Sequence, residues 1–198
     1  MQGKKLLLTA AGLSILFLAS PVMAIMSAPY GWYLEGNAGS SHLSKVSYPG
    51  STSSSGIGGN ANIGYKFMPF FGMEAGYTQY ANSSIDDSSG TKAASIKHYT
   101  YDLAARGILP IATSGFELFA KLGIQRIAST TTIKNNGAAS ALGLASGTST
   151  STGGYVGAGA QYYFIPELAA NVQWQRAMGN STTGTEDLLS GGVSFIFD

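Results

Sequence analysis

The 198-residue sequence has no cysteine and few charged residues. Without cysteine, the chain forms no disulfide, no thiolate metal site and no lipid-modified N-terminal cysteine. Charged residues make up 11% of the chain, against roughly 25% in ordinary soluble domains, which argues against a cytoplasmic globule. The formal net charge is only +1 and no long basic stretch interleaves with aromatic residues. Nucleic acid is therefore not expected as a partner.

The N-terminus has the pattern of a secretory signal peptide. Two lysines lie within the first five residues, residues 6–18 carry no charge, and small residues end at Ala24. This order predicts a signal peptide over residues 1–24, with cleavage after Ala24 or, as a weaker alternative, Ala28. A membrane-anchoring helix is the other interpretation, but the apolar run is shorter than the ~20 residues that span a bilayer. We expect one further domain, residues 25–198.

The mature chain also lacks a long hydrophobic run. No stretch of 18 apolar residues follows Ala24, so the sequence offers no membrane-spanning helix. The low charge content then needs another explanation. A closed β-barrel is the other architecture that satisfies every backbone polar group inside a bilayer.

Eight segments alternate between apolar and polar or glycine residues with period two, as strands do. In the first, Trp32 and Leu34 share one face while Tyr33, Glu35 and Asn37 share the other. The expected strands are Trp32–Ser40, Ile57–Phe67, Phe71–Tyr80, Ile96–Leu109, Phe116–Ala128, Tyr155–Phe164, Leu168–Met178 and Leu189–Phe197.

The connectors between these strands alternate in length. Three are short and contain a turn-forming proline or glycine, whereas four are long and rich in Ser, Thr, Gly and Asn. Short turns at one rim and long loops at the other indicate an outer-membrane barrel. The sequence predicts an all-β fold, an eight-stranded antiparallel up-and-down transmembrane β-barrel. Its long connectors, 41–56, 81–95, 129–154 and 179–188, are expected to be loops, and the third, of low complexity, to be mobile.

A soluble lipocalin-like barrel has the same strand number but needs a polar outer face. Here the charged residues share a face with Asn and Gln, and the opposite face carries aliphatic and aromatic residues. The aromatic residues cluster near the short turns, as an interfacial girdle does. They are Trp32, Tyr65, Phe67, Phe70, Phe71, Phe116, Phe164, Phe195 and Phe197.

The segments "GAQYYFIPELAANVQWQ" (159–175) and "LSGGVSFIF" (189–197) resemble the closing strands of the outer membrane protein A transmembrane domain. The blocks "WYLEGNAG", "FGMEAGY", "AARGILPI" and "FAKLG" agree with that family. The resemblance implies an outer-membrane location and a C-terminal aromatic recognised by the barrel-assembly machinery, although Asp198 follows Phe197 here. Because the sequence ends there, we expect no peptidoglycan-binding domain after the barrel.

The resemblance also implies ion pairs inside the barrel. Glu74 matches the family's inward glutamate on the third strand, and Arg106 its inward basic residue on the fourth. Asn171 and Gln161 stand where the family has an inward arginine and glutamate, which removes alternative ion-pair partners. The resemblance therefore does not extend to gating by exchange of those partners.

Alternation predicts a balanced charge network in the lumen. An eight-stranded barrel is just wide enough for side chains to fill, and buried charges need partners. We expect Glu74–Arg106 to be the central pair and Glu117 to lie at the turn-side rim. The network comprises Glu35, Lys66, Glu74, Asp102, Arg106 and Lys121.

Three basic residues break the apolar outer face near the long loops: Lys97, Arg126 and Arg176. A cation is costly at the bilayer midplane but costs little near the interface. These side chains either extend to solvent or contact lipopolysaccharide phosphates.

The sequence offers little for catalysis. The two histidines are His42, in the first long connector, and His98, inward by parity at the loop end of its strand. A His/Ser/acid set resembles that of lipid A deacylases, which are also eight-stranded barrels, but their histidine lies on a late strand and none follows residue 98 here. We expect no enzyme, cofactor or metal site.

The predicted function is a structural or surface-interaction role in the bacterial outer membrane. The expected partners are outer-membrane lipid, lipopolysaccharide and a host or surface ligand bound by the four long loops. A small porin or low-conductance channel is the alternative, and a lipid A-modifying enzyme is a remote one.

Overall fold

The computed structural model describes residues 30–44, 46, 51–111 and 114–197. The predicted signal peptide lies outside these residues. Ten strands and one short helix follow one another along the chain. They are β1 (Gly31–Ser44), β2 (Ser51–Ser53), β3 (Ser55–Met68), β4 (Phe71–Gln79), β5 (Ser83–Asp86), β6 (Lys92–Ile111), β7 (Phe116–Ile133), α1 (Asn136–Ala141), β8 (Gly147–Ile165), β9 (Leu168–Met178) and β10 (Thr185–Phe197).

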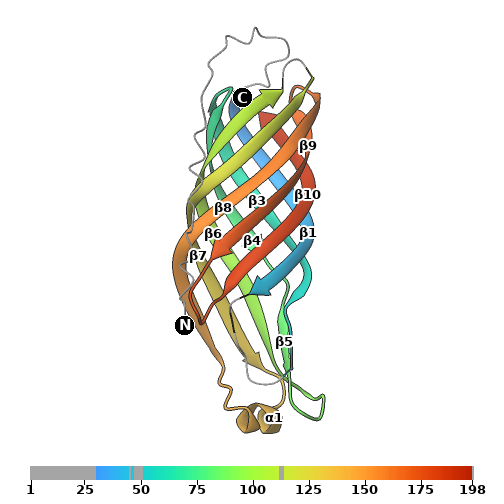
Figure 1. Cartoon of the computed structure of the whole chain (residues 1–198), viewed down its shortest axis with the longest axis vertical. Coiled ribbons are helices and arrows are strands. Elements are labelled where there is room, and N and C mark those ends of the chain that lie inside the picture. Colours follow the sequence, from blue (N-terminus) through green and yellow to red (C-terminus); the bar gives the residue numbers. More distant parts are fainter. Residues whose placement is uncertain (1–29, 45, 47–50, 112–113, 198) are drawn as a thin grey trace, which may run out of the picture.

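Eight of these strands close into a barrel (Figure 1). Their order around the ring is β6-β4-β3-β1-β10-β9-β8-β7, and the pairing of β6 with β7 closes it. All neighbouring strands run antiparallel, and β1 pairs with β10 from Trp32–Phe197 to Ser44–Thr185. The predicted eight-stranded antiparallel barrel is confirmed.

Side chains alternate between the lumen and the outside along each barrel strand. In β1, Tyr33, Glu35 and Asn37 are buried, whereas Trp32 and Leu34 are about half exposed. The outward face is apolar and the buried face is mostly polar, the reverse of a lipocalin-like barrel. The face assignment made from the sequence is therefore correct.

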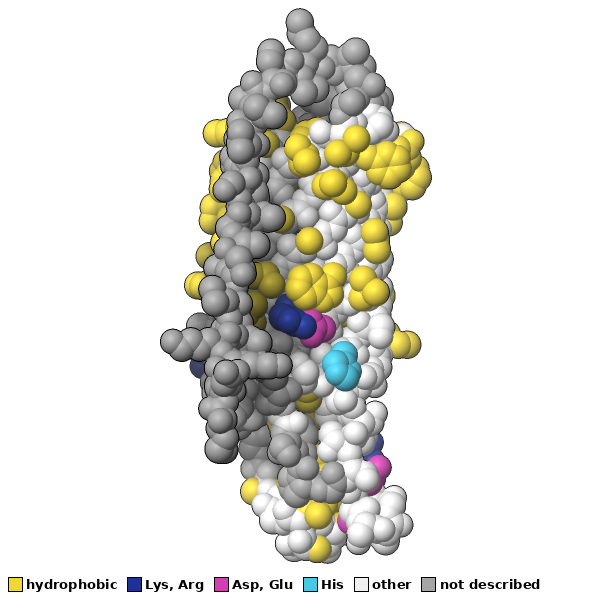
Figure 2. Space-filling view, in the orientation of Figure 1, with side chains coloured by type: hydrophobic (Ala, Val, Ile, Leu, Met, Phe, Trp, Pro, Cys, Tyr) yellow, Lys and Arg dark blue, Asp and Glu magenta, His cyan; other side chains and the backbone are white. Residues whose placement is uncertain are grey.

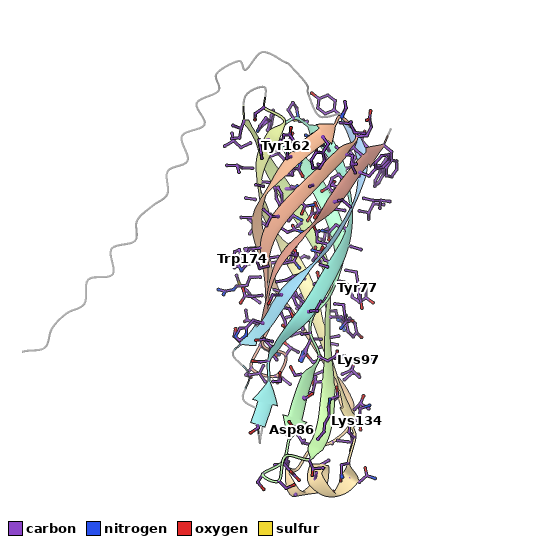
Figure 3. All side chains as sticks on the ribbon, turned by 90° about the vertical axis from the view of Figure 1, so that its right-hand side faces the viewer. Tyr77, Asp86, Lys97, Lys134, Tyr162 and Trp174 are labelled. Carbon is purple, nitrogen blue, oxygen red and sulfur yellow. The ribbon has the colours of Figure 1, made fainter. Side chains whose placement is uncertain are left out.

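Exposed aromatic side chains form two groups along the outer surface. One lies near the short turns and includes the contacts Phe116–Tyr162 at 4.6 Å and Trp32–Tyr65 at 5.3 Å between ring centroids. The other, nearer the long connectors, contains Tyr77, Tyr99 and Tyr101 in mutual contact. Figure 3 places Tyr162 near one end of the barrel and Tyr77 and Trp174 well below it. Two such groups are expected at the two interfaces of a bilayer.

Beyond the barrel, the strands continue as a projecting sheet (Figure 1). The β6–β7 hairpin pairs without interruption from Ile111–Phe116 to Ala94–Ile133. Strand β5 pairs with the start of β6, and β2 pairs with β5. Helix α1 lies at the tip, where the side chain of Asn135 accepts a hydrogen bond from the Ala138 N–H. Within the described part of the chain, no helix is long and apolar enough to cross a membrane.

The expectation of four plain loops was partly wrong. All four long connectors contribute strand residues, namely β2, β5 and the extended ends of β1, β3, β6, β7, β8 and β10, and the third also contains α1. At the start of β8, beyond the barrel, residues 147–150 are exposed on both faces, so Ser and Thr occupy both and the alternation that marks a half-buried strand disappears. For this reason the sequence predicted a loop for the low-complexity connector.

Candidate functional site

Four charged side chains meet in the middle of the lumen, one each from β1, β4, β6 and β7. Arg106 Nη1 lies 2.9 Å from Glu35 Oε2 and 3.2 Å from Glu74 Oε2. Lys121 Nζ lies 2.7 Å from Glu74 Oε1 and 3.3 Å from Glu35 Oε1. Each cation thus contacts both carboxylates, and the four charges sum to zero. We call Glu35, Glu74, Arg106 and Lys121 the central cluster.

Neighbouring side chains hold Arg106 in place. Its Nη2 donates to Gln161 Oε1 at 2.7 Å, and its guanidinium lies 3.9 Å from the centre of the Phe119 ring. The Tyr33 hydroxyl donates to Glu74 Oε2 at 2.8 Å. With only 2% of its surface exposed, Arg106 is fully desolvated, so its stability in the lumen depends on these partners.

Lys66 pairs outside the central cluster. Its Nζ lies 2.8 Å from Glu117 Oε1, and Gln161 Nε2 donates to Glu117 Oε2 at 2.6 Å. Glu117 lies at the turn-side end of β7 and is 5% exposed, so its carboxylate depends on these buried partners. Gln161 links this pair to Arg106.

Asp102 has a different environment. It is buried, but neither carboxyl oxygen receives a hydrogen bond and no ion pair forms with the described residues. A β-carbon at Gly76, its register partner, would lie 2.7 Å from both carboxyl oxygens. The absence of a side chain at Gly76 thus provides the space that Asp102 occupies.

Apolar side chains flank the polar interior at both ends. One buried group contains Tyr33, Tyr163, Ala169 and Ile196, near the short turns. The other contains Tyr80, Ile127, Ala177 and Leu188, toward the long connectors. A pocket of about 10 Å³ beside Arg106 and Lys66 holds roughly one water molecule. Side chains of the described residues therefore occupy the lumen at these two apolar levels and at the central cluster between them.

A second polar group lies at the loop end of the barrel. The His98 ring is completely buried. Its Nε2 lies 3.1 Å from Ser83 Oγ, and its Nδ1 lies 3.0 Å from Ser129 Oγ and 3.3 Å from Glu186 Oε1. His42 lies outside, with Nδ1 2.7 Å from Ser55 Oγ. No group of three metal-ligating side chains occurs among the described residues.

The tip of the β5–β6 hairpin is fixed by Asp87. Its Oδ1 accepts hydrogen bonds from the Ser89 hydroxyl at 2.6 Å and from the backbone N–H groups of Thr91 and Ser89 at 2.9 Å. These donors hold the pKa of the exposed Asp87 carboxyl below its usual value. The turn thus keeps a negative charge at neutral pH.

Comparison of the sequence with known protein families identifies the family of this barrel. A family model described as "Outer membrane protein beta-barrel domain" matches residues 10–197. The chain belongs to the outer membrane β-barrel family. Its location is therefore the cell outer membrane, and the resemblance to outer membrane protein A-like barrels is confirmed. No curated protein matches the sequence.

Solved outer membrane barrels share the fold at low identity. OprG from Pseudomonas aeruginosa has a TM-score of 0.61 and 16% identity, covering 88% of this chain and 99% of that protein. Neisserial surface protein A has a TM-score of 0.59 and 18% identity, covering 84% and 97%. Ail of Yersinia pestis, solved with the heparin analogue sucrose octasulfate, has a TM-score of 0.50 and 14% identity, covering 83% and 99%.

The three cations on the outside of this outer membrane barrel have different surroundings. Arg176 is paired: its Nε and Nη2 lie 2.8 and 3.0 Å from the Asp187 carboxylate, and its guanidinium lies 5.4 Å from the Trp174 ring centre. Arg126 is exposed and donates one long hydrogen bond, 3.4 Å, to Thr150 Oγ1. Lys97 is exposed and makes no ion pair with any described residue.

Sequence reasoning missed the His98 group because its members come from connectors. Ser83 and Glu186 both lie in segments predicted to be loops, where alternation gave no inward or outward assignment. The buried apolar ends of the lumen were also missed, although Tyr33 and Ile196 do have inward parity. The aromatic residues near the short turns predicted only the outer girdle and not this buried group.

Proposed function

We propose that this chain is a surface protein of the outer membrane, in which the barrel is an anchor and the projecting sheet makes the contacts. The observation that carries the proposal is the filled lumen. Figure 2 shows hydrophobic side chains over the barrel and mostly neutral polar side chains over the projection. With apolar groups at both ends and a neutral central cluster between them, the interior supports rigidity, while the projecting strands supply exposed surface.

Conductance distinguishes this role from a small porin. We expect the purified protein in a planar lipid bilayer to produce no single-channel steps, because side chains block the lumen at three levels. The measurement is the current trace at fixed voltage, with a protein-free detergent sample as the control. Reproducible steps of uniform size would instead support the channel and contradict the anchor role.

We propose that Lys97 and Arg126 contact lipopolysaccharide phosphates. Both cations lie next to the loop-side tyrosines, where the outer interface of the bilayer is expected, and Figure 3 shows Lys97 just below Tyr77. Arg176 is a weaker candidate because Asp187 already neutralises it. Phe197, at the end of β10, is the proposed signal for the barrel-assembly machinery.

Charge removal tests the lipopolysaccharide contact. We expect lipopolysaccharide in the vesicles to raise the unfolding temperature of the wild type, because a ligand that binds only the folded state stabilises it. The Lys97→Gln/Arg126→Gln double variant should lose most of that increase. Lys134→Gln, on the projection, is the matched control and should keep it; equal losses in both proteins would contradict the assignment.

We propose a structural role for His98, Ser83, Ser129 and Glu186. A serine, a histidine and a carboxylate in hydrogen-bond reach also occur in hydrolases, but here all four side chains are buried. A substrate would have no access to the Ser83 hydroxyl without separation of the strands. The contacts of His98 with Ser83, Ser129 and Glu186 join β5, β6, β7 and β10 at the loop end of the barrel, and this structural role explains why the four side chains lie together.

A further inference from the structure

The first residues of β8 form an open strand edge outside the barrel. Residues 147–152 pair with β7 on one side, from Gly147–Thr131 to Thr152–Arg126. Strand β9 joins the other side of β8 only from Tyr155 onward. Among the described residues, nothing pairs with that second side, so every other residue directs its N–H and C=O toward solvent.

This edge lacks the features that normally prevent strands from associating. Natural edge strands are protected by charged residues, proline, bulges or covering segments. Residues 147–153 contain only Gly, Thr and Ser, and the pairing with β7 is regular across them. These residues are exposed, except for Ser151 and Gly153, which are half buried.

The same residues read identically in both directions. Gly147-Thr148-Ser149-Thr150-Ser151-Thr152-Gly153 is a palindrome centred on Thr150. If a second copy of this strand lies antiparallel with the same centre, Thr148 faces Thr152 and Ser149 faces Ser151. Threonine and serine pairs across strands stabilise a sheet by hydrogen bonding, as Thr130 and Thr148 already do at 3.1 Å. The edge is therefore complementary to itself and carries no charge that would repel a copy.

We propose that the open edge of β8 pairs antiparallel with the same edge of a second copy of this chain. A two-fold axis perpendicular to the sheet at Thr150 relates the two copies, so their barrels point in opposite directions. The projection in Figure 1 extends β8 beyond the barrel, which places this contact outside the membrane. The two copies then lie in two facing membranes, and the contact joins one cell to another. This inference rests on the proposed surface role and names its partner.

Cysteine cross-linking tests both the contact and its register, because the chain has no cysteine of its own. Opposite residues of antiparallel strands have Cα atoms about 4.5–5.5 Å apart, which a disulfide bridges. With the full chain in phosphatidylcholine vesicles under oxidant, Thr150→Cys should form dimers. Thr148→Cys and Thr152→Cys should each form few dimers alone and many when the two vesicle populations are mixed. Thr182→Cys, on another exposed loop, is the control.

Two results would overturn the proposal. One is a dimer yield for Thr150→Cys no greater than that for Thr182→Cys. The other is efficient dimerisation of Thr148→Cys alone, which would indicate a parallel or non-specific contact. In either case, a bilayer current that remains silent would leave the proposed anchor role standing, so the two failures are distinguishable.

Charge substitution at the centre separates self-pairing from capture of a different protein. Thr150→Lys vesicles should not cluster, because two lysines face each other across the axis, and Thr150→Glu vesicles should behave alike. Mixing the two populations should restore clustering to about the wild-type extent. A homotypic contact would be contradicted if Thr150→Lys vesicles alone clustered as much as wild-type vesicles. It would also be contradicted if mixing the two well-folded variants did not restore clustering.

Discussion

Replacing Arg106 with glutamine is expected to lower the free energy of unfolding of the barrel by about 3–5 kcal/mol. The arginine lies within 3.2 Å of both Glu35 and Glu74, and its removal leaves Lys121 as the only cation in the central cluster. Glutamine is shorter and neutral, so two desolvated carboxylates would share one partner. The loss of the guanidinium stacked on Phe119 adds to the effect.

Urea-dependent folding into lipid vesicles measures this change. Arg126→Gln, made on the neighbouring strand β7, is the matched control because Arg126 is exposed, and it should change stability by no more than about 0.5 kcal/mol. Combining Arg106→Gln with Glu35→Gln should be less destabilising than the sum of the two single changes, since the partners act together. Two small, additive effects would show that the central cluster does not stabilise the lumen.

The second large effect is expected at Gly39 of β1. A β-carbon there would lie 2.0 Å from the Leu189 carbonyl oxygen and 2.5 Å from the Ser190 Cα of β10. Because both are backbone atoms, no side-chain rotation relieves the overlap and the strands must separate. We expect Gly39→Ala to cost about 3 kcal/mol, at the upper end of the range for overpacking.

Gly36 of the same strand provides the control. A β-carbon at Gly36 would meet no atom within 4 Å, since this position is on the outer face. Gly36→Ala should therefore fold like the wild type, with a change of no more than about 1 kcal/mol. Thermal unfolding in one lipid compares the three proteins; equal unfolding temperatures would contradict the close approach of β1 and β10.

The alternation of inward and outward side chains along single strands predicted much of the fold. In β1 the sequence from Trp32 to Asn37 alternates because one side meets lipid and the other meets the lumen, and that constraint acts on each residue separately. The same reasoning placed Glu35 and Glu74 inside. Strand number and connector lengths then left few barrel topologies to consider.

Parity could not predict which inward charges meet. Partners across the lumen depend on the tilt of the strands and on the stagger of their register, neither of which is visible in one segment. Lys66 therefore pairs with Glu117 rather than with the central cluster, and Asp102 faces Gly76. Glu186 was missed for a different reason, because it lies in a connector predicted to be a loop, where no inward or outward face was assigned.

The unbroken β6–β7 hairpin determines how a pull on the projection would be carried. Its hydrogen-bond ladder runs from the short turn through the barrel to Ala94–Ile133, so tension applied at the tip loads the ladder lengthwise. Many bonds then share the load and must slide together, whereas a flexible tether would transmit the same pull to a single point. A force on the projection would thus reach the barrel through continuous strands rather than through a flexible linker.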